Sequence, residues 1–131
     1  MKYLIDTDIA SYFLRGKYNL IKTFEKKDSS NLRLSIITIA QLEVLAYRNP
    51  YSKINLATIG NLVQRMGVLD IDRQTWKIFS QTKAETLKTG KTRGDLDILQ
   101  ASIAKQHDLI VVTHNTSHYQ DIVGWEDWTT G

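Results

Sequence analysis

The chain contains no cysteine, and this absence removes several classes of function at once. Disulfides, iron–sulfur clusters and thiolate zinc sites all need cysteine sulfur. A chain without thiols fits a reducing compartment, and we expect no signal peptide before Tyr3. We therefore expect a cytoplasmic protein.

Proline and long apolar runs are also scarce. Pro50 is the one proline, and no stretch rich in proline, glycine and serine divides the 131 residues. We therefore expect a single domain over residues 1–131. No apolar run approaches the ~20 residues of a membrane span, so we expect no membrane contact.

Neither sign of charge dominates, with 17 basic and 14 acidic residues and a net charge of +3. Their distribution is uneven, because basic residues gather near residues 15–27 and 83–93, and acidic ones between residues 95 and 127. A basic surface around an acidic pocket suits a metal-dependent enzyme that acts on a polyanion.

Near its start the sequence has a short apolar run, Tyr3 to Ile5, followed directly by Asp6. Such a run predicts a buried parallel strand. Thr7 or Asp8 is then expected to cap a helix that ends near Gly16. Asp6 would lie at the carboxyl end of a strand, where open α/β sheets bind their ligands.

The remaining pattern alternates between short apolar runs and one-sided helical periodicity. It predicts further strands at 32–37, 68–71, 109–112 and 122–125, and helices at 20–27, 38–48, 54–66, 73–88 and 97–107. In the helix that Asp72 would cap, Trp76, Phe79 and Leu87 are expected to share an apolar face. Alternating strands and helices indicate an α/β fold with a central parallel sheet and helices on both faces.

Polar side chains follow several of these strands or open these helices: Asp6, the pair Asp95 and Asp97, and Asn115. Either Gln41 or Glu43 would join them from a third helix. In a parallel sheet these positions converge on one edge. Clustered carboxylates favour a hard cation, Mg²⁺ or Mn²⁺, which orients a water for attack on a phosphodiester.

Other chemistries fit less well, since the chain has no glycine-rich phosphate loop and no nucleophile-elbow serine. The run Asp6-Thr7-Asp8 after a strand also occurs in haloacid-dehalogenase-like phosphatases, which we keep as a remote alternative. That family has Thr or Val where this chain has Ala10, and an acidic residue where it has Leu99.

Four stretches together resemble a known family: Tyr3-Leu4-Ile5-Asp6-Thr7-Asp8, Ser35-Ile36-Ile37-Thr38-Ile39-Ala40, Gly94-Asp95-Leu96-Asp97-Ile98-Leu99-Gln100-Ala101-Ser102 and Val112-Thr113-His114-Asn115-Thr116-Ser117-His118-Tyr119. Over nearly its whole length the chain resembles a PIN domain, and within that family a VapC-type toxin of the VapBC toxin–antitoxin systems.

The resemblance implies a PIN-like three-layer sandwich and a Mg-dependent endoribonuclease that a VapB-type antitoxin neutralises, often as a homodimer. Asp6 and Asp97 match the two central metal carboxylates, Asn115 the fourth polar position, and Asp95 an auxiliary acid. For the RNA substrate we expect contacts from Thr7, Arg15, Lys91 and Arg93.

One position departs from the family, whose second acidic residue falls three after the threonine of Ser-Ile-Ile-Thr. Here that position is Gln41, and Glu43 lies about 200° further around the helix. From the family register we predict that Gln41 faces the pocket. A catalytically weakened PIN scaffold that acts by RNA or partner binding is therefore the alternative function.

A partner surface is expected on the first helices. Exposed apolar residues there, such as Tyr12, Phe13 and Tyr18, would form a groove for an antitoxin segment.

Overall fold

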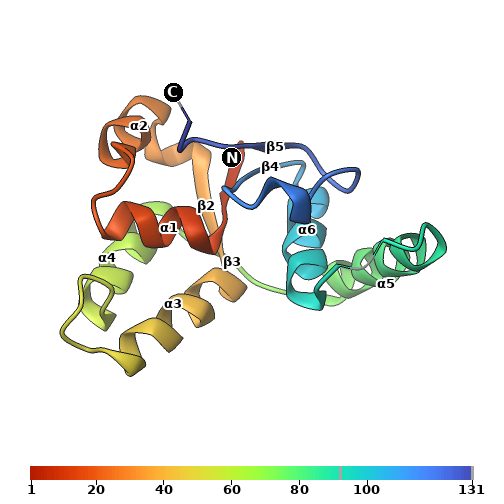
Figure 1. The fold of residues 1–131 in the computed structure, drawn as a ribbon, viewed down its shortest axis with the longest axis horizontal. Helices are drawn as coiled ribbons and strands as arrows, with labels where there is room; N and C mark the ends of the chain where they lie inside the picture. Colours follow the sequence, from red (N-terminus) through yellow and green to blue (C-terminus); the bar gives the residue numbers. More distant parts are fainter. Residues whose placement is uncertain (92, 131) are drawn as a thin grey trace.

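The computed structural model describes residues 1–91 and 93–130, which form a five-stranded parallel sheet between two groups of helices. The strands lie in the order β3-β2-β1-β4-β5 (Figure 1), and every neighbouring pair is parallel. Their bounds are β1 Tyr3–Ile5, β2 Leu32–Ser35, β3 Val68–Leu69, β4 Ile110–Val112 and β5 Trp125–Glu126.

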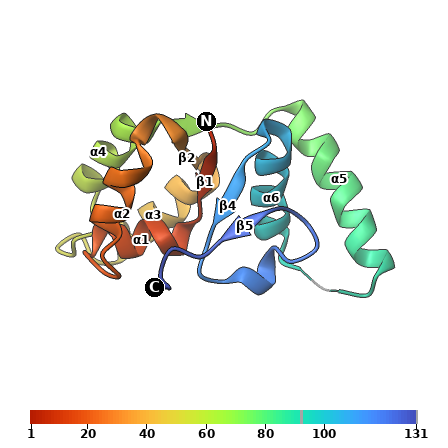
Figure 2. The same cartoon turned by 90° about the horizontal axis from the view of Figure 1, so that it is seen from above.

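The helices lie on both sides of the sheet, so the fold is the expected α/β three-layer sandwich (Figure 2). On one side lie α1 Thr7–Leu14, α2 Leu20–Lys27, α3 Ile36–Arg48 and α4 Leu56–Met66. On the other lie α5 Arg73–Lys88 and α6 Asp95–His107. Two short 3-10 helices, η1 Ser29–Asn31 and η2 Thr116–His118, complete the described elements.

Side chains of strand β1 pack into both halves of the core, because successive side chains of a strand point to opposite faces of the sheet. Tyr3 and Ile5 pack into the cluster formed with α1 to α4. Leu4 packs into the second cluster, which includes Leu99 and Val111. All three side chains of β1 are buried, as the short apolar run predicts for a central parallel strand.

The strand order creates a switch point between β1 and β4. From β1 the chain moves outward through β2 to β3, and then returns across the sheet to β4 on the other side of β1. The carboxyl ends of these strands meet at one edge, where Asp6 follows β1, Ser35 ends β2 and Thr113 follows β4. Open α/β sheets bind their ligands at such a switch point.

Four helices, α1, α3, α4 and α6, begin up to three residues from the predicted start, and the caps of α1 and α3 show why. The carboxylate of Asp6 itself accepts the bond from the Thr7 amide, so Asp6 caps α1 in place of Thr7 or Asp8. Helix α3 begins at Ile36 because the Ser35 hydroxyl accepts from the Thr38 amide, so Thr38 lies inside the helix. Both changes bring the cap residue to the end of its strand.

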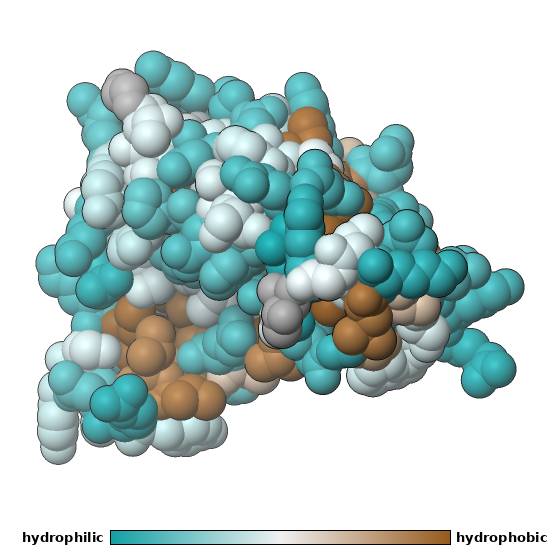
Figure 3. All heavy atoms as spheres, turned by 45° about the vertical axis from the view of Figure 1, so that its right-hand side comes forward, coloured by the Kyte–Doolittle hydropathy of each residue, from teal (hydrophilic) through white to brown (hydrophobic). Residues whose placement is uncertain are grey.

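The predicted apolar face of α5 was wrong in part. Trp76 and Leu87 are 50% and 68% exposed, whereas three threonines, Thr75, Thr82 and Thr86, are the buried residues of this helix. Their side chains are short, so α5 lies close against α6. On the face that Figure 3 shows, polar residues cover most of the surface and apolar ones form separate patches.

No helix in the described part of the chain is both long and apolar enough to cross a membrane.

Candidate active site

A pocket of about 400 Å³ opens at the carboxyl edge of the sheet, beside the switch point. It collects side chains from α1, α3, α6 and the segment after β4, which lie far apart in the sequence. Its wall is formed by Asp6, Thr7, Asp8, Ser11, Tyr12, Arg15, Gln41, Leu45, Asp97, Asn115 and His118. Three carboxylates therefore share one cavity.

Asp6 is held by four hydrogen-bond donors. Its Oδ1 accepts from the Thr7 amide at 2.9 Å and from Gln100 Nε2 at 3.3 Å. Its Oδ2 accepts from Thr113 Oγ1 at 2.9 Å and from Tyr119 OH at 3.1 Å. Burial, followed by the neighbouring Asp8 carboxylate, nevertheless raises the pKa of Asp6 from 3.8 to about 6. The ionised side chain is fixed in position but is electrostatically unfavourable without a cation.

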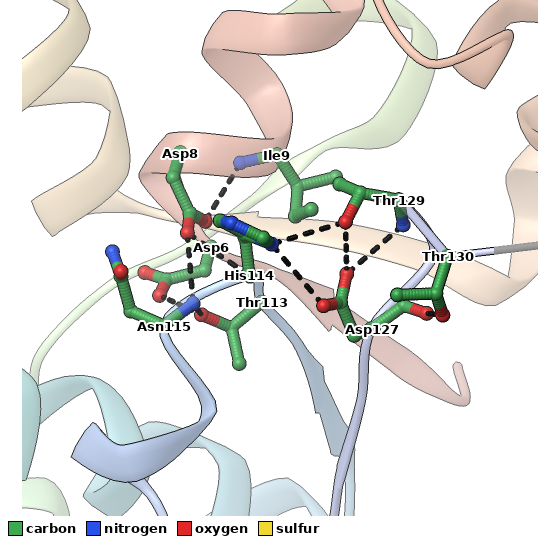
Figure 4. Close-up of polar contacts among 9 residues, drawn as sticks. All are labelled: Asp6, Asp8, Ile9, Thr113, His114, Asn115, Asp127, Thr129 and Thr130. Atoms are coloured by element: carbon green, nitrogen blue, oxygen red, sulfur yellow. Dashed lines mark hydrogen bonds and ion pairs between the residues drawn. The ribbon is translucent and has the colours of Figure 1, made fainter.

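Asp8 ties the start of α1 to the loop that follows β4 (Figure 4). Its Oδ1 accepts from the Ile9 amide at 2.7 Å, and its Oδ2 accepts from the amides of His114 and Asn115 at 3.0 and 3.2 Å. These bonds position the backbone of Asn115, whose side chain lies on the pocket wall. Asp8, expected to be a turn or cap residue, thus also lines the pocket.

A hydrogen-bonded network lies beneath the pocket and centres on Gln100, which is 2% exposed. Its Nε2 donates to Asp6 and, at 3.1 Å, to Thr38 Oγ1, while its Oε1 accepts from Ser35 Oγ at 2.5 Å. Thr7 Oγ1 connects the network to the pocket wall through Thr38 and Gln41 Oε1. Buried polar groups must be paired in this way to avoid a desolvation cost.

Asp97 enters the pocket from the first turn of α6, where the helix dipole favours a carboxylate. Its Oδ2 lies 3.2 Å from His118 Nδ1. Burial first, and then the charges of Asp6, Asp97 and Asp8, raise the pKa of Tyr119. The Tyr119 hydroxyl therefore remains protonated and a donor beside these three carboxylates.

The structure places Gln41, and not Glu43, on the pocket wall. Gln41 Oε1 accepts a hydrogen bond from Thr7 Oγ1, so its side chain points toward the start of α1. Glu43 is on a different side of α3 and is not among the pocket residues. The position to which the resemblance assigns a second acid thus carries an uncharged amide here.

Other expected site residues lie outside the pocket. Asp95 precedes Asp97 by two positions, and its Oδ1 lies 2.5 Å from Lys83 Nζ of α5. Lys91 pairs with Asp121 at 2.7 Å, and Arg93 donates to the Gln120 carbonyl at 3.0 Å. Of the residues expected to contact RNA, Thr7 and Arg15 alone line this pocket.

The donor set of the pocket fits a hard cation. Within residues 1–91 and 93–130, no three His, Asp or Glu side chains converge closely enough to form a metal site by themselves. Mg²⁺ needs fewer protein ligands, because it binds one or two carboxylates and completes its shell with water and substrate phosphate. The unfavourable charge of Asp6 beside Asp8 is the feature that a cation would relieve.

Sequence reasoning did not find three residues that hold Asp6: Gln100, Thr113 and Tyr119. Two of them carried a usable signal. Gln100 is three residues after Asp97, so both lie on one face of α6. Thr113 follows β4 directly, as Asp6 follows β1. Tyr119 gave no comparable signal, because it reaches Asp6 from beyond η2.

Of the residues expected to dock an antitoxin, Phe13 lies apart from Tyr12 and Tyr18, whose rings contact each other. Phe13 stacks on Phe24 with ring centroids 4.3 Å apart and borders a groove of about 190 Å³ between α1 and α4. Tyr12 instead faces the pocket, and Tyr18 lies outside the helices in the segment between α1 and α2. The groove is lined by Phe13, Leu14, Thr58, Asn61, Leu62 and Arg65.

Comparison with known proteins points to one family. A sequence model of the PIN domain matches residues 3–122. Ribonuclease VapC2 from Haemophilus influenzae is 29% identical over 130 residues, covering 98% of both chains. The tRNA(fMet)-specific endonuclease VapC from Shigella flexneri is 28% identical over 131 residues, covering 98% of this chain and 99% of that protein.

Solved structures agree with the sequence relatives. A chain in the crystal structure of DNA-bound VapBC from Salmonella typhimurium superposes with a TM-score of 0.88 at 28% identity and covers 98% of both chains. A chain of VapBC-1 from nontypeable Haemophilus influenzae gives a TM-score of 0.85 at 27% identity, covering 99% of this chain and 100% of that one.

Proposed function

This chain belongs to the PIN domain family, and from that membership we propose that it is a metal-dependent endoribonuclease toxin with a VapB-type antitoxin as its partner. The observation that carries the proposal is the convergence of Asp6, Asp97 and Asn115 on one pocket. Relatives named ribonuclease and tRNA endonuclease support the reaction class. We also propose a cytoplasmic location, which fits the proposed RNA substrate.

Asp6 and Asp97 are the proposed ligands of one Mg²⁺ or Mn²⁺. When bound, the cation supplies an oriented water and stabilises the charge that develops on the scissile phosphate. Asp6 is suited to this role because its four hydrogen bonds fix the carboxylate before any ligand arrives. Pre-organised ligands of this kind avoid a reorganisation cost during reaction.

The other polar residues of the pocket would orient water and substrate. The amide oxygens of Asn115 and Gln41, which line the pocket, would accept hydrogen bonds from water near the carboxylates. Arg15, on the same wall, supplies a cationic group for an RNA phosphate. RNA would then bind across a pocket that is acidic at its centre and basic at its edge.

The alternative is a PIN scaffold with weak catalysis, which the uncharged Gln41 supports. Gln41 offers a carbonyl oxygen but no negative charge, so a second cation would bind more weakly there. In that case the protein would act by RNA or partner binding. A metal-dependent cleavage assay separates the two functions.

The antitoxin would dock in the groove between α1 and α4. Its apolar residues Phe13, Leu14 and Leu62 suit the apolar face of a helical segment, and Arg65 at its edge suits an acidic residue. Solved VapBC complexes among the structural neighbours support such a partner. A homodimer is also proposed, because Val44 and Tyr47 of α3 are 56% and 72% exposed.

The test is RNA cleavage by the purified chain with Mg²⁺, with Mn²⁺ and with EDTA. We expect cleavage with either cation, none with EDTA and none from Asp6→Asn. Asp70→Asn is the matched control, because Asp70 is exposed and lies outside the pocket. Hydrolysis of p-nitrophenyl phosphate without RNA cleavage would instead favour the phosphatase alternative, and RNA binding without cleavage would favour the weakened scaffold.

A further inference from the structure

Three aromatic rings gather at the edge of the pocket. Tyr12 lines the pocket, and its ring centroid lies 4.9 Å from that of Tyr18 and 6.2 Å from that of His114. The rings of Tyr18 and His114 are close to parallel, with an interplanar angle of 25° and centroids 6.4 Å apart. Tyr18 is 50% exposed, and the His114 side chain is 45% exposed. The cluster therefore presents open ring surface beside the acidic pocket.

The His114 ring is fixed by the end of the chain (Figure 4). Its Nδ1 lies 3.2 Å from Asp127 Oδ2 and 3.0 Å from Thr129 Oγ1. Thr129 Oγ1 in turn donates to Asp127 Oδ1 at 2.7 Å, which holds this pair together. The backbone amide of His114 donates to Asp8 of the pocket. An exposed ring with this many anchors is held in one orientation relative to the carboxylates.

The backbone of Tyr18 adopts an unfavourable conformation. Its φ of 57° lies in the left-handed region, as does the φ of 57° at Asn19. This region is uncommon for a bulky residue, and such strain costs on the order of 1–3 kcal/mol when the surroundings enforce it. In this conformation the Tyr18 ring packs edge-on against Tyr12 and lies beside His114.

The positively charged side chain of Arg15 also belongs to this cluster. The guanidinium of Arg15 lies 5.4 Å from the Tyr12 ring centroid, and Arg15 also lines the pocket. Aromatic rings interleaved with a basic side chain are the common means of binding single-stranded nucleic acid, because each base has a face that stacks and each linkage carries a phosphate. Both parts of that pattern lie here within one cluster next to the pocket.

We propose that Tyr18 and His114 form a stacking site for one base of single-stranded RNA, next to the nucleotide whose phosphate enters the pocket. The inference rests on the proposed nuclease function, which it extends by a substrate contact. The Tyr12 ring packs edge-on against both rings, and Arg15 takes the phosphate between the two nucleotides. Asp127 and Thr129 act as positioning residues through His114.

The experiment measures cleavage and base stacking separately. Tyr18→Phe keeps the ring, whereas Tyr18→Leu removes it, and His114→Leu removes the second ring. Stacking is read from the quenching of 2-aminopurine placed at successive positions of a short single-stranded RNA, in EDTA so that the strand stays intact. Tyr51→Leu is the matched control, because Tyr51 is 96% exposed and lies outside the cluster.

We expect the wild type and Tyr18→Phe to quench one position and Tyr18→Leu and His114→Leu to lose that quenching. In cleavage, Tyr18→Leu should raise KM about tenfold and leave kcat within about twofold, since one base stack is lost while the pocket is intact. An abasic nucleotide at the quenched position should lower wild-type affinity to that of Tyr18→Leu. The same nucleotide should not weaken the variant further.

The outcomes distinguish this inference from the proposed function. Quenching that depends on Tyr18 in a chain that never cuts RNA would support the stacking site and overturn the nuclease. Cleavage with wild-type KM and quenching in both leucine variants would overturn the stacking site alone. So would a Tyr18→Leu variant that binds RNA normally but loses its antitoxin, because the rings would then face a protein. A melting temperature of Tyr18→Phe equal to that of the wild type would verify that this variant keeps the fold.

Discussion

The hydroxyl of Tyr119 donates a 3.1 Å hydrogen bond to Asp6 Oδ2 and so joins two residues that are 113 positions apart. Tyr119 is fully buried, and its raised pKa keeps it a donor throughout the neutral range. Asp6 therefore remains both buried and oriented in the absence of any cation. The pH dependence of the protein follows from this combination.

Asp6 should make the metal-free protein less stable as pH rises from about 4 to about 6. The pKa of Asp6 is about 6 in the folded chain against an ordinary value of 3.8, so the folded state holds the proton over this interval when the unfolded state has lost it. Stability falls wherever the folded state binds more protons. The full effect is at most about 3 kcal/mol.

Urea unfolding in EDTA between pH 4 and pH 7 measures this effect as the difference between wild type and Asp6→Asn. The variant should lack the decrease and be the more stable protein at pH 7, because it has no buried charge. Its amide oxygen can accept from the Thr7 amide and Gln100, and its amide nitrogen can donate to the hydroxyls of Thr113 and Tyr119, which then act as acceptors. Added Mg²⁺ should stabilise the wild type more at pH 7 than at pH 5, and the variant at neither. Parallel pH curves for the two proteins would contradict the assignment.

Asp97 and Asp95 should differ sharply in their contribution to cleavage. Asp97 lines the pocket, whereas Asp95 pairs with Lys83 outside it. We expect Asp97→Asn to reduce kcat by at least about a hundredfold and Asp95→Asn to stay within about threefold of wild type. Single-turnover cleavage of one RNA measures both variants. A large loss from Asp95→Asn would restore the auxiliary acid that the family resemblance implies.

Helices and strands were predicted well where their pattern of apolar residues lies within one short stretch of sequence. The apolar run Tyr3–Ile5 and the helix Leu20–Lys27 match the structure at both ends. Helix α5 was harder, because its contact with α6 uses threonines in place of the apolar residues that periodicity detects. Short side chains at a close helix contact leave no apolar signal in a single sequence.

The pocket was predictable to the extent that parallel strands share one carboxyl edge. Asp6, Asp97 and Asn115 could be placed together for that reason, whereas Gln41 was chosen over Glu43 from the family register. The structure brings all four to one pocket. The hydrogen bonds beneath the pocket could not be predicted, since they depend on side-chain directions from four elements, α1, β2, α3 and α6. Asp95 shows the same limit: its position in α6 is close to Asp97, but its direction is toward α5.

Gln100 should be more important for stability than its uncharged side chain suggests. Gln100→Leu would remove the acceptor of the buried Ser35 hydroxyl, together with one donor to Thr38 Oγ1 and one to Asp6 Oδ1. Unsatisfied buried groups cost about 1–3 kcal/mol, which is the expected loss in the free energy of unfolding. Gln64→Leu on the exposed face of α4 is the control and should change stability by less than about 0.5 kcal/mol. Equal losses of stability in Gln100→Leu and Gln64→Leu would show that the hydrogen-bonded network around Gln100 makes no specific contribution to stability.

Gln41 offers the sharpest substitution, because it lies on the pocket wall at the position where the family resemblance implies an acid. Gln41→Glu keeps the oxygen that accepts from Thr7 Oγ1 and adds a negative charge near Asp6 and Asp97. The added charge should tighten Mg²⁺ binding and raise cleavage at low Mg²⁺, while lowering the stability of the metal-free protein through repulsion. Titration of cleavage with Mg²⁺, together with melting in EDTA, measures both effects.

Glu43→Gln is the matched control for this change, since it makes the reverse substitution on the same helix outside the pocket. We expect its Mg²⁺ dependence to equal that of the wild type. If Glu43→Gln were inactive and Gln41→Glu neutral, Glu43 would be the residue that acts on the cation and α3 would have to rotate when the metal binds. If Gln41→Glu tightened Mg²⁺ binding but left the maximal rate unchanged, the missing acid would affect only cation affinity. The natural Gln41 would then set the Mg²⁺ concentration at which the enzyme works, without lowering its maximal rate.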